Sequence, residues 1–289
     1  MPSMVGRTAL VTGAAGGLGK AIATALSREG ATVVVVARSE ARAGEVIRDI
    51  RAVVPQASLE PLPCDVSIQA SVRAAVEMFE SRHQQLNLLV NAAGVFRKER
   101  TVTPDGLELT FATNVMSYFL LTRLLEDALK RGSIQQTSRV VNIASKYSGG
   151  PSVTKIDFDD LQTANGKYSY IRATPPTMLA RVLLTQEFAE RLRGSNVVVN
   201  AAHPGLVKNT RLLLDIGGPF RLLTNALGKP AEEAADTPVW LATSPETAGV
   251  TGKLWAKRKQ LPTPGMGSDP AARKRLWEEC SRLAALTAG

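Results

Sequence analysis

Glycine residues recur over residues 12–19, where the chain reads TGAAGGLG between a short apolar run and a segment with helical spacing. Glycine lets the backbone bend sharply and approach a bound group closely, and the N-terminus of the following helix attracts negative charge. A turn of this kind between a strand and a helix suits the pyrophosphate of a dinucleotide. The residues expected to contact the dinucleotide there are Gly13, Ala15, Gly17, Leu18 and Gly19.

The residues that follow the second apolar run, 32–37, indicate which dinucleotide is preferred. An acidic residue at that place accepts hydrogen bonds from the ribose 2′-hydroxyl of NAD, whereas a basic residue pairs with the 2′-phosphate of NADP. This chain has Arg38 and Ser39 at that place and no carboxylate. The planar guanidinium of Arg38 suits phosphate, and Arg42 is a second candidate. We therefore expect NADP(H) as the cofactor, with Arg38 and Ser39 among its contacts.

Strand-like and helix-like segments alternate along the chain and must position these residues. The expected strands cover residues 9–11, 32–37, 86–91, 139–144, 196–201 and 250–255, and residues 58–63 lead into Asp65. The expected helices follow the glycine turn and cover residues 39–53, 67–82, 107–131 and 175–193. This alternation predicts an α/β fold, a doubly wound, Rossmann-like parallel sheet with helices on both faces. No linker-like break divides residues 1–289, so we expect a single domain.

Composition limits the function classes. The chain has 289 residues, of which 44% are hydrophobic, and this is enough for one large core. Cys64 and Cys280 lie far apart and show neither metal-ligand nor disulfide spacing, so we expect no metal and a cytoplasmic protein. No segment resembles a targeting peptide or a membrane span, which predicts no membrane partner. We attribute the net charge of +9 to a solvated basic surface and expect no nucleic-acid partner, because no aromatic residues interleave to stack on bases.

Further motifs are spread over nearly the whole chain. Besides the glycine turn they are Asp65-Val66, residues 91–94 (NAAG), Asn114, Ser145, residues 200–205 (NAAHPG), residues 242–246 (ATSPE), Asp269-Pro270 and Leu276-Trp277. Together they resemble the short-chain dehydrogenase/reductase family, and within it the retinol-dehydrogenase-like branch. The resemblance implies the same fold and an oxidoreductase.

The resemblance also implies roles in the adenine half of the cofactor site. Asp65 resembles the residue that contacts the adenine amino group, with the backbone of Val66 beside it. Asn91, Ala92 and Gly94 resemble the segment that lines the adenine ribose and steadies the sheet.

A second set of matches concerns the nicotinamide half. Pro204, Gly205 and Val207 resemble the loop that lies against the nicotinamide. Thr210, or Asn209 in a shifted register, is expected to reach the carboxamide or a phosphate.

The pattern breaks at the proton-transfer residues. In the family a tyrosine exchanges the substrate proton, a lysine four residues later lowers the tyrosine pKa, a serine polarises the carbonyl, and an asparagine supports a water relay. Ser145 and Asn114 match the last two. The tyrosine and lysine positions hold Thr174 and Met178, in the register set by residues 178–189. A threonine hydroxyl is a far weaker acid than tyrosine, and methionine carries no charge.

Two structural interpretations of this segment stay open. Thr174 followed by Pro175 suits the N-cap and first position of a helix. In an alternative register Tyr168 and Arg172 form a Tyr-x-x-x-Arg pair, and the two following prolines would then fall inside the helix. Tyr147 is a further candidate proton donor.

These observations predict an NADP(H)-dependent carbonyl or ketone reductase with an atypical proton donor, such as Tyr147, water or a hydroxyl of the substrate. Segments 148–172 and 211–228 are expected to cover the substrate, and the leucines of the second predict an apolar, fairly bulky small molecule. The alternative hypotheses are a non-redox cyclase, isomerase or dehydratase on the same fold, and a catalytically silent NADP-binding protein. The sequence also leaves a homo-oligomer open.

Overall fold

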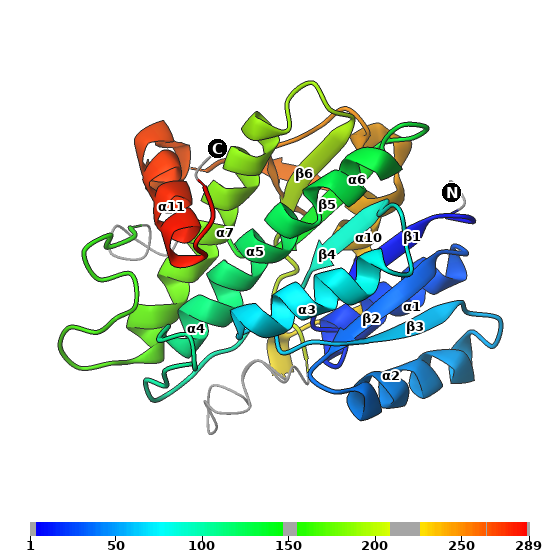
Figure 1. Cartoon of the computed structure of the whole chain (residues 1–289), viewed down its shortest axis with the longest axis horizontal. Coiled ribbons are helices and arrows are strands. Elements are labelled where there is room, and N and C mark those ends of the chain that lie inside the picture. Colours follow the sequence, from blue (N-terminus) through cyan, green and yellow to red (C-terminus); the bar gives the residue numbers. More distant parts are fainter. Residues whose placement is uncertain (1–3, 147–154, 209–225, 264, 288–289) are drawn as a thin grey trace.

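Seven strands of the described chain lie parallel in one sheet, and an eighth extends it antiparallel (Figure 1). The computed structural model describes residues 4–146, 155–208, 226–263 and 265–287. The strands are β1 Thr8–Val11, β2 Thr32–Ala37, β3 Leu59–Pro63, β4 Leu88–Asn91, β5 Ser138–Ile143, β6 Val197–Ala202, β7 Leu254–Ala256 and β8 Lys259–Leu261. Their order is β3-β2-β1-β4-β5-β6-β7-β8. The chain direction across the sheet reverses between β1 and β4, which confirms the predicted doubly wound sheet and places the expected crevice at the carboxyl ends of these strands.

Helices cover both faces of this sheet (Figure 1). One face carries α3 Gln69–Glu80, α5 Ser117–Leu124, α6 Glu126–Gly132, α7 Tyr170–Arg191 and α11 Pro270–Leu283. The other carries α1 Gly17–Arg28, α2 Glu40–Val53 and α10 Asp236–Thr243. The single turns α4 Leu109–Phe111 and α9 Ala231–Ala234 precede longer helices.

Alternate side chains of each strand enter two separate cores. Val34 and Val36 of β2 join the core beneath α3, α5 and α7, whereas Val33 and Val35 join the core beneath α1 and α2. All four are at most 3% exposed. A strand buried on both faces appears in the sequence as a continuous apolar run, and this is why residues 32–37 predict a strand so directly.

Two predicted elements differ from the structure. The helix expected over residues 107–131 is interrupted by a π-helical turn, Ala112–Met116, and by a break at Leu125. The last strand expected over residues 250–255 is a hairpin of β7 and β8 instead, with φ angles of 49° and 57° at Lys257 and Arg258. The sequence conceals this hairpin because its turn lacks the Asn and Gly residues that normally favour positive φ.

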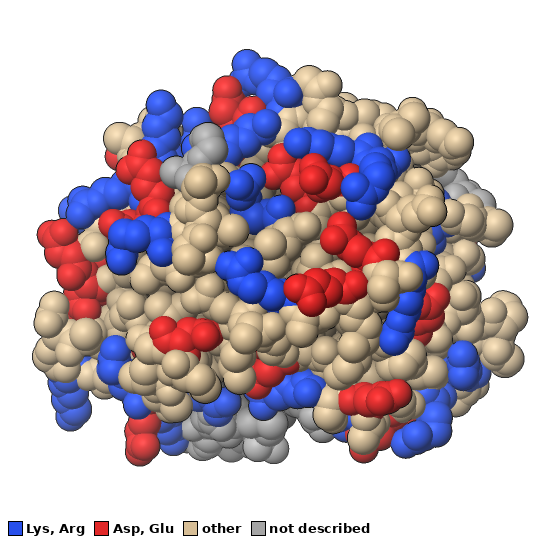
Figure 2. Space-filling view, viewed as in Figure 1, with Lys and Arg blue, Asp and Glu red and all other residues tan. Residues whose placement is uncertain are grey.

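Charges are mixed over the face that Figure 2 shows, where basic and acidic side chains lie interspersed. Ion pairs among the described residues include Lys130 with Glu126 and Arg131 with Glu80. Within the described ranges, no helix combines the length and apolar character needed to cross a membrane.

Candidate active site

The glycine turn after β1 is fixed by Thr12. The hydroxyl oxygen of Thr12 accepts hydrogen bonds from Ala92 N at 2.9 Å and Ala93 N at 3.2 Å, which joins the turn to the loop after β4. Gly13 has a φ of 68°, and a Cβ there would lie 2.7 Å from Ala92 O. A Cβ at Gly19 would lie 2.4 Å from Gly13 O. Only glycine fits at both positions, so the sequence pattern reflects close backbone packing at the start of α1.

The first turn of α1 offers backbone amides to an anion. The N-cap residue Gly16 supplies no side-chain hydrogen bond, so the positive end of the helix dipole and the N–H groups of Gly17 and Leu18 are left for a ligand. Ala15 is held from α2, because Arg42 Nη2 donates to its carbonyl oxygen at 3.2 Å. This arrangement fits the pyrophosphate of a dinucleotide.

Arg38 and Ser39 follow β2 at the same edge of the sheet, and both are exposed. Within the described chain the Arg38 guanidinium takes part in no hydrogen bond or ion pair. The Ser39 hydroxyl is engaged as the N-cap of α2, where it accepts from Arg42 N at 3.3 Å. Arg42 is itself paired with Glu45, so Arg38 is the better placed of the two arginines to meet an added phosphate.

Asp65 lies beyond the end of β3 and is half-buried, as is Val66. Asp65 Oδ1 accepts from Ser67 N at 3.0 Å and from Ser67 Oγ at 2.7 Å, and Asp65 N donates to Ser71 Oγ at 2.9 Å. These bonds fix the turn that leads into α3. Among the residues described, none bonds to Asp65 Oδ2, so this oxygen can accept from the amino group of an adenine.

Asn91 stabilises the sheet through a buried amide chain. Its Nδ2 donates to Asn142 Oδ1 at 2.9 Å and to Thr122 Oγ1 at 3.3 Å. Asn142 Nδ2 in turn donates to Thr185 Oγ1 at 2.9 Å. The chain links β4, β5 and α7, and it holds the loop of residues 92–94 at the carboxyl edge of the sheet. The Asn91 side chain has no exposed surface, so any cofactor contact at this segment must come from that loop.

Ser145 lies just beyond the end of β5 and is half-buried. Within the described ranges, its hydroxyl makes one weak contact, at 3.4 Å to Lys146 O. It is therefore able to donate to a substrate oxygen. His203 lies just beyond the neighbouring strand β6, and burial, reinforced by Lys146, lowers its pKa. The imidazole is thus neutral at neutral pH.

Asn114 lies within the π-helical turn and is fully buried. Its Oδ1 accepts from Val95 N at 2.9 Å, and its Nδ2 donates to Val95 O at 3.0 Å and to Thr177 Oγ1 at 3.2 Å. Its main-chain carbonyl accepts from Arg181 Nε at 2.7 Å. A water relay at Asn114 would therefore share this carbonyl with a guanidinium. Such π turns concentrate at functional sites, and the sequence carries no signal for this one.

Helix α7 begins at Tyr170, and Ser169 is its N-cap, with Oγ accepting from Arg172 N at 3.4 Å. The prediction that Thr174 caps this helix is therefore wrong. Pro175 and Pro176 lie inside the helix, where each removes a backbone donor. Serine and threonine are both good N-caps. Pro175 suits the first position of a helix and therefore wrongly favoured Thr174 over Ser169.

The alternative Tyr-x-x-x-Arg pair is not assembled in the structure. Tyr168 Oη donates to Glu108 Oε1 at 3.0 Å and lies 3.1 Å from Thr110 Oγ1, and burial raises the Tyr168 pKa to about 12. Arg172 is exposed and donates to Lys167 O at 2.8 Å. Tyr168 thus contacts residues at α4, whereas Arg172 contacts the loop before α7.

The side chain at the tyrosine position is buried, and the one at the lysine position is half-buried. Thr174 is 1% exposed, and its hydroxyl has no hydrogen-bond partner among the described residues. Met178 is half-buried, with Sδ 3.6 Å from Nη1 of Arg181. Arg181 is itself buried. Nothing in the sequence singles out Arg181, because an arginine on a helix normally indicates solvent-exposed surface.

The loop after β6 contains Pro204, Gly205 and Val207. Gly205 has a φ of 80°, a conformation that favours glycine. The loop is tied to a later segment, since Val207 forms a β-bridge with Lys229. Thr210, Asn209 and Tyr147 lie outside the described residues, as do residues 148–154 and 211–225 of the two expected substrate-covering segments.

Comparison with known proteins agrees with this geometry. A family model described as short chain dehydrogenase matches residues 7–156. Retinol dehydrogenase 14 of Homo sapiens is 35% identical over 297 residues, which cover 95% of this chain and 85% of that protein. Polyprenol dehydrogenase of Mus musculus is 36% identical over 292 residues, which cover 98% of this chain and 85% of that protein.

Solved structures show the same architecture. The RhlG/NADP active-site complex of Pseudomonas aeruginosa is similar with a TM-score of 0.69 and 28% identity, covering 89% of this chain and 97% of that one. A 3-ketoacyl-(acyl-carrier-protein) reductase of Brucella melitensis complexed with NADH is similar with a TM-score of 0.68 and 26% identity, covering 88% and 98%. The chain belongs to the short-chain dehydrogenase/reductase family of oxidoreductases, in its retinol-dehydrogenase-like branch.

Proposed function

We propose that this chain is an NADPH-dependent carbonyl reductase that acts on an apolar, fairly bulky ketone or aldehyde. The proposal rests on two available polar groups at the carboxyl edge of the sheet, the Arg38 guanidinium after β2 and the Ser145 hydroxyl after β5. When bound, NADPH supplies a hydride to the carbonyl carbon, the oxygen takes up a proton, and an alcohol and NADP⁺ result. Arg38 would bind the 2′-phosphate through charge-assisted hydrogen bonds, and Ser145 would donate to the developing oxyanion.

Two observations support an apolar substrate. Two relatives carry names that specify apolar alcohols, retinol and polyprenol. The segment 211–228 is rich in leucine and follows, in the sequence, the loop expected at the nicotinamide. An apolar substrate that loses its hydration on binding would gain from such a cover.

The proton in this proposal does not come from α7, because Thr174 and Met178 replace the tyrosine and lysine. A hydroxyl on the substrate beside the reacting carbonyl would stabilise the oxyanion through an intramolecular hydrogen bond. Tyr147 and water are the other candidate sources.

The proposal is tested with a pair of aromatic ketones, one carrying a neighbouring phenolic hydroxyl and one lacking it. NADPH oxidation should be at least about tenfold faster with the hydroxylated ketone, a difference in barrier of roughly 1.4 kcal/mol. Ser145→Ala should lower turnover by about tenfold or less, since one hydrogen bond worth about 1 kcal/mol is lost. Equal rates on the two ketones would exclude substrate assistance. Tight NADPH binding with no consumption over a wide panel of ketones and aldehydes would exclude the reductase and favour a non-redox reaction.

The cofactor preference is tested with Arg38→Asp. Loss of a charge-assisted pair costs about 1.5 to 3 kcal/mol, so NADPH should bind at least about tenfold more weakly, while NADH binding is unchanged or improved. Arg51→Asp is the matched control, because Arg51 is an exposed arginine in the last turn of α2. Tryptophan fluorescence titration gives both dissociation constants. Wild-type protein that binds NADH as tightly as NADPH would refute the preference.

A further inference from the structure

Arg181 is a buried cation that contacts three segments of the candidate site. It is 4% exposed. Its guanidinium donates to three main-chain carbonyl oxygens, with Nε 2.7 Å from Asn114 O, Nη1 2.9 Å from Ile143 O and Nη2 3.1 Å from Ala93 O. The three acceptors come from the π-helical turn, the end of β5 and the loop after β4. One side chain of α7 thus joins the three segments that shape the carboxyl edge.

The positive charge of Arg181 is not neutralised by a carboxylate. Within the described residues no Asp or Glu forms an ion pair with it, and its partners are neutral carbonyl groups and the Tyr118 ring, whose centroid lies 4.3 Å from Cζ. The Tyr118 hydroxyl donates to two of the same carbonyls, at 2.9 Å from Ala93 O and 3.3 Å from Ile143 O. Burial raises the Tyr118 pKa to about 12, so the phenol is no counter-ion. Burial lowers the pKa of Arg181, but arginine stays protonated in proteins, so its positive charge remains buried beside this part of the site.

The position of Arg181 in the sheet places this charge in the nicotinamide half of the site. The adenine half lies at β2 and β3, where Arg38 and Asp65 follow the strands. The carbonyls that bind Arg181 lie on the other side of the switch point, after β4 and β5. Ile143 is the last residue of β5, two positions before Ser145. A dinucleotide that spans the switch point brings its reactive ring to this half.

We propose that Arg181 determines the oxidation state of the cofactor that the site prefers, by favouring the reduced form. The nicotinamide ring is neutral in NADPH and positively charged in NADP⁺. A buried cation with no carboxylate partner among the described residues, in the half of the site that would receive this ring, would raise the free energy of the bound oxidised form and leave that of the reduced form nearly unchanged. The site therefore binds NADPH more tightly than NADP⁺ and releases NADP⁺ readily. This inference rests on the proposed NADPH-dependent function and identifies the residue that sets the preference between its two cofactor forms.

Met178 adds no second positive charge beside Arg181. The side chain at the lysine position is uncharged, and its Sδ lies 3.6 Å from Arg181 Nη1. Among the described residues of this helix turn, Arg181 is thus the group that carries positive charge toward the site. A second cation introduced at position 178 would lie next to the first and would strengthen the same potential.

The test compares the dissociation constants of NADPH and NADP⁺ by titration, with no substrate present. Neutralising Arg181 in Arg181→Gln and Arg181→Met should lower the ratio of the NADP⁺ constant to the NADPH constant by roughly tenfold, the order expected for one charge in a partly buried site. Arg181→Lys should retain most of the wild-type ratio. Met178→Lys, at a half-buried position, should raise the ratio and keeps the test decisive if the Arg181 variants do not fold.

Arg139 supplies the matched control. It is equally buried, at 4% exposed, and its Nη atoms also donate to main-chain carbonyls, at 2.8 Å from Leu241 O and 2.8 Å from Ser244 O. It lies at the opposite end of β5 from the site. Arg139→Gln should lower the melting temperature and leave the ratio unchanged.

The outcomes separate this inference from the proposed function. If both constants rise equally in Arg181→Gln and Arg181→Met, and Met178→Lys leaves their ratio unchanged, Arg181 has a structural role only and the inference is overturned. If the ratio of the two dissociation constants falls in the neutral variants although the wild type shows no reductase activity, the result supports the inference and counts against the reductase. Failure of the wild type to bind either form would overturn both.

Discussion

At the scale of the residue, Thr174 is the substitution with the clearest physical signature. A buried hydroxyl normally finds a partner, because leaving it without one costs about 1 to 3 kcal/mol. Thr174 Oγ1 has none among the described residues, although the neighbouring Thr177 Oγ1 donates to Thr174 O at 2.6 Å. The two threonines of one helix thus differ in whether their hydroxyl groups are satisfied.

This difference predicts opposite effects of two matched substitutions. Thr174→Val replaces an unsatisfied hydroxyl by a methyl group of similar size, so the free energy of unfolding should stay the same or rise by up to about 2 kcal/mol. Thr177→Val removes the bonds to Thr174 O and Asn114 and should lower it by about 1 to 2 kcal/mol. Urea unfolding measures both. Equal destabilisation, or loss of turnover in Thr174→Val alone, would show that the Thr174 hydroxyl has a partner, in the protein or in the substrate.

At the scale of the element, α7 tolerates two prolines because of where the lost acceptors lie. Proline at 175 and 176 leaves the carbonyls of residues 171 and 172 without their helical donors. Ile171 and Arg172 are both exposed, so water can reach these carbonyls. The first turn of α7 is thus held by the Ser169 cap and by tertiary contacts more than by its own backbone hydrogen bonds.

Restoring one of these backbone hydrogen bonds should therefore stabilise the helix. Pro176→Ala regains a backbone donor and should raise the free energy of unfolding, by less than the roughly 3 kcal/mol cost of an interior proline because proline also restricts the unfolded chain. Pro270→Ala is the control, since Pro270 is the first residue of α11 and removes no helical bond there. Chemical unfolding that shows no gain, or the same change in both variants, would mean that Pro176 fits its place without cost.

The start of α7 also illustrates how far the sequence predicts the structure. The parallel strands and the glycine turn are predictable, because continuous apolar runs and glycine spacing are local signals. The choice between Ser169 and Thr174 as the cap depends on Tyr168, which bonds to Glu108 from a distant part of the chain. The contacts of Arg181 are equally hidden, since its three carbonyl partners lie at positions 93, 114 and 143.

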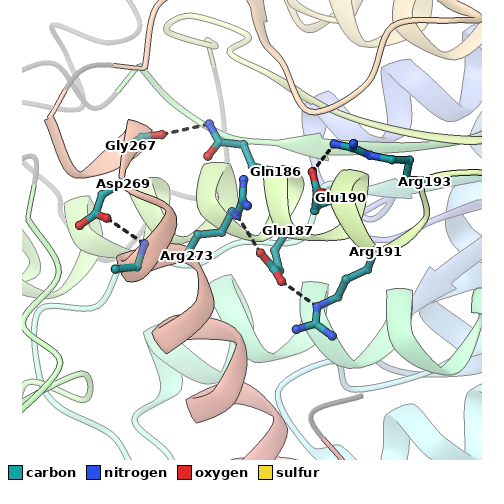
Figure 3. A network of polar contacts seen from close by, with 9 residues as sticks. Gln186, Glu187, Glu190, Arg191, Arg193, Gly267, Asp269 and Arg273 are labelled. Atoms are coloured by element: carbon teal, nitrogen blue, oxygen red, sulfur yellow. Dashed lines mark hydrogen bonds and ion pairs between the residues drawn. The ribbon is translucent and has the colours of Figure 1, made fainter.

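At the scale of the whole molecule, the last helix closes the core on the side of α5 and α7 (Figure 1). Trp277 has no exposed surface, and its ring lies 5.0 Å from that of Phe119 and 4.9 Å from that of Phe188. Beside it, Glu187 of α7 binds two arginines, Arg191 on its own helix and Arg273 on α11, each with N and O atoms 2.7 Å apart (Figure 3). The C-terminal helix is therefore fastened to the helix that carries Arg181.

This network predicts that Glu187 holds α11 in place. The Glu187 side chain is 4% exposed, so Glu187→Gln removes a buried carboxylate that pairs with two arginines and should lower the free energy of unfolding. Loss of one partner of a buried pair costs about 3 to 5 kcal/mol, and because Arg191 and Arg273 are 29% and 20% exposed we expect about 1 to 3 kcal/mol. The control is Glu190→Gln, one turn further along α7, which breaks the exposed pair with Arg193 shown in Figure 3 and should cost less than about 0.5 kcal/mol. Urea unfolding at low and high salt checks both, since the Glu187 effect should persist at high salt and the Glu190 effect should vanish. Equal and salt-sensitive losses would place Glu187 among ordinary surface ion pairs and leave the docking of α11 to its apolar contacts, which include Trp277.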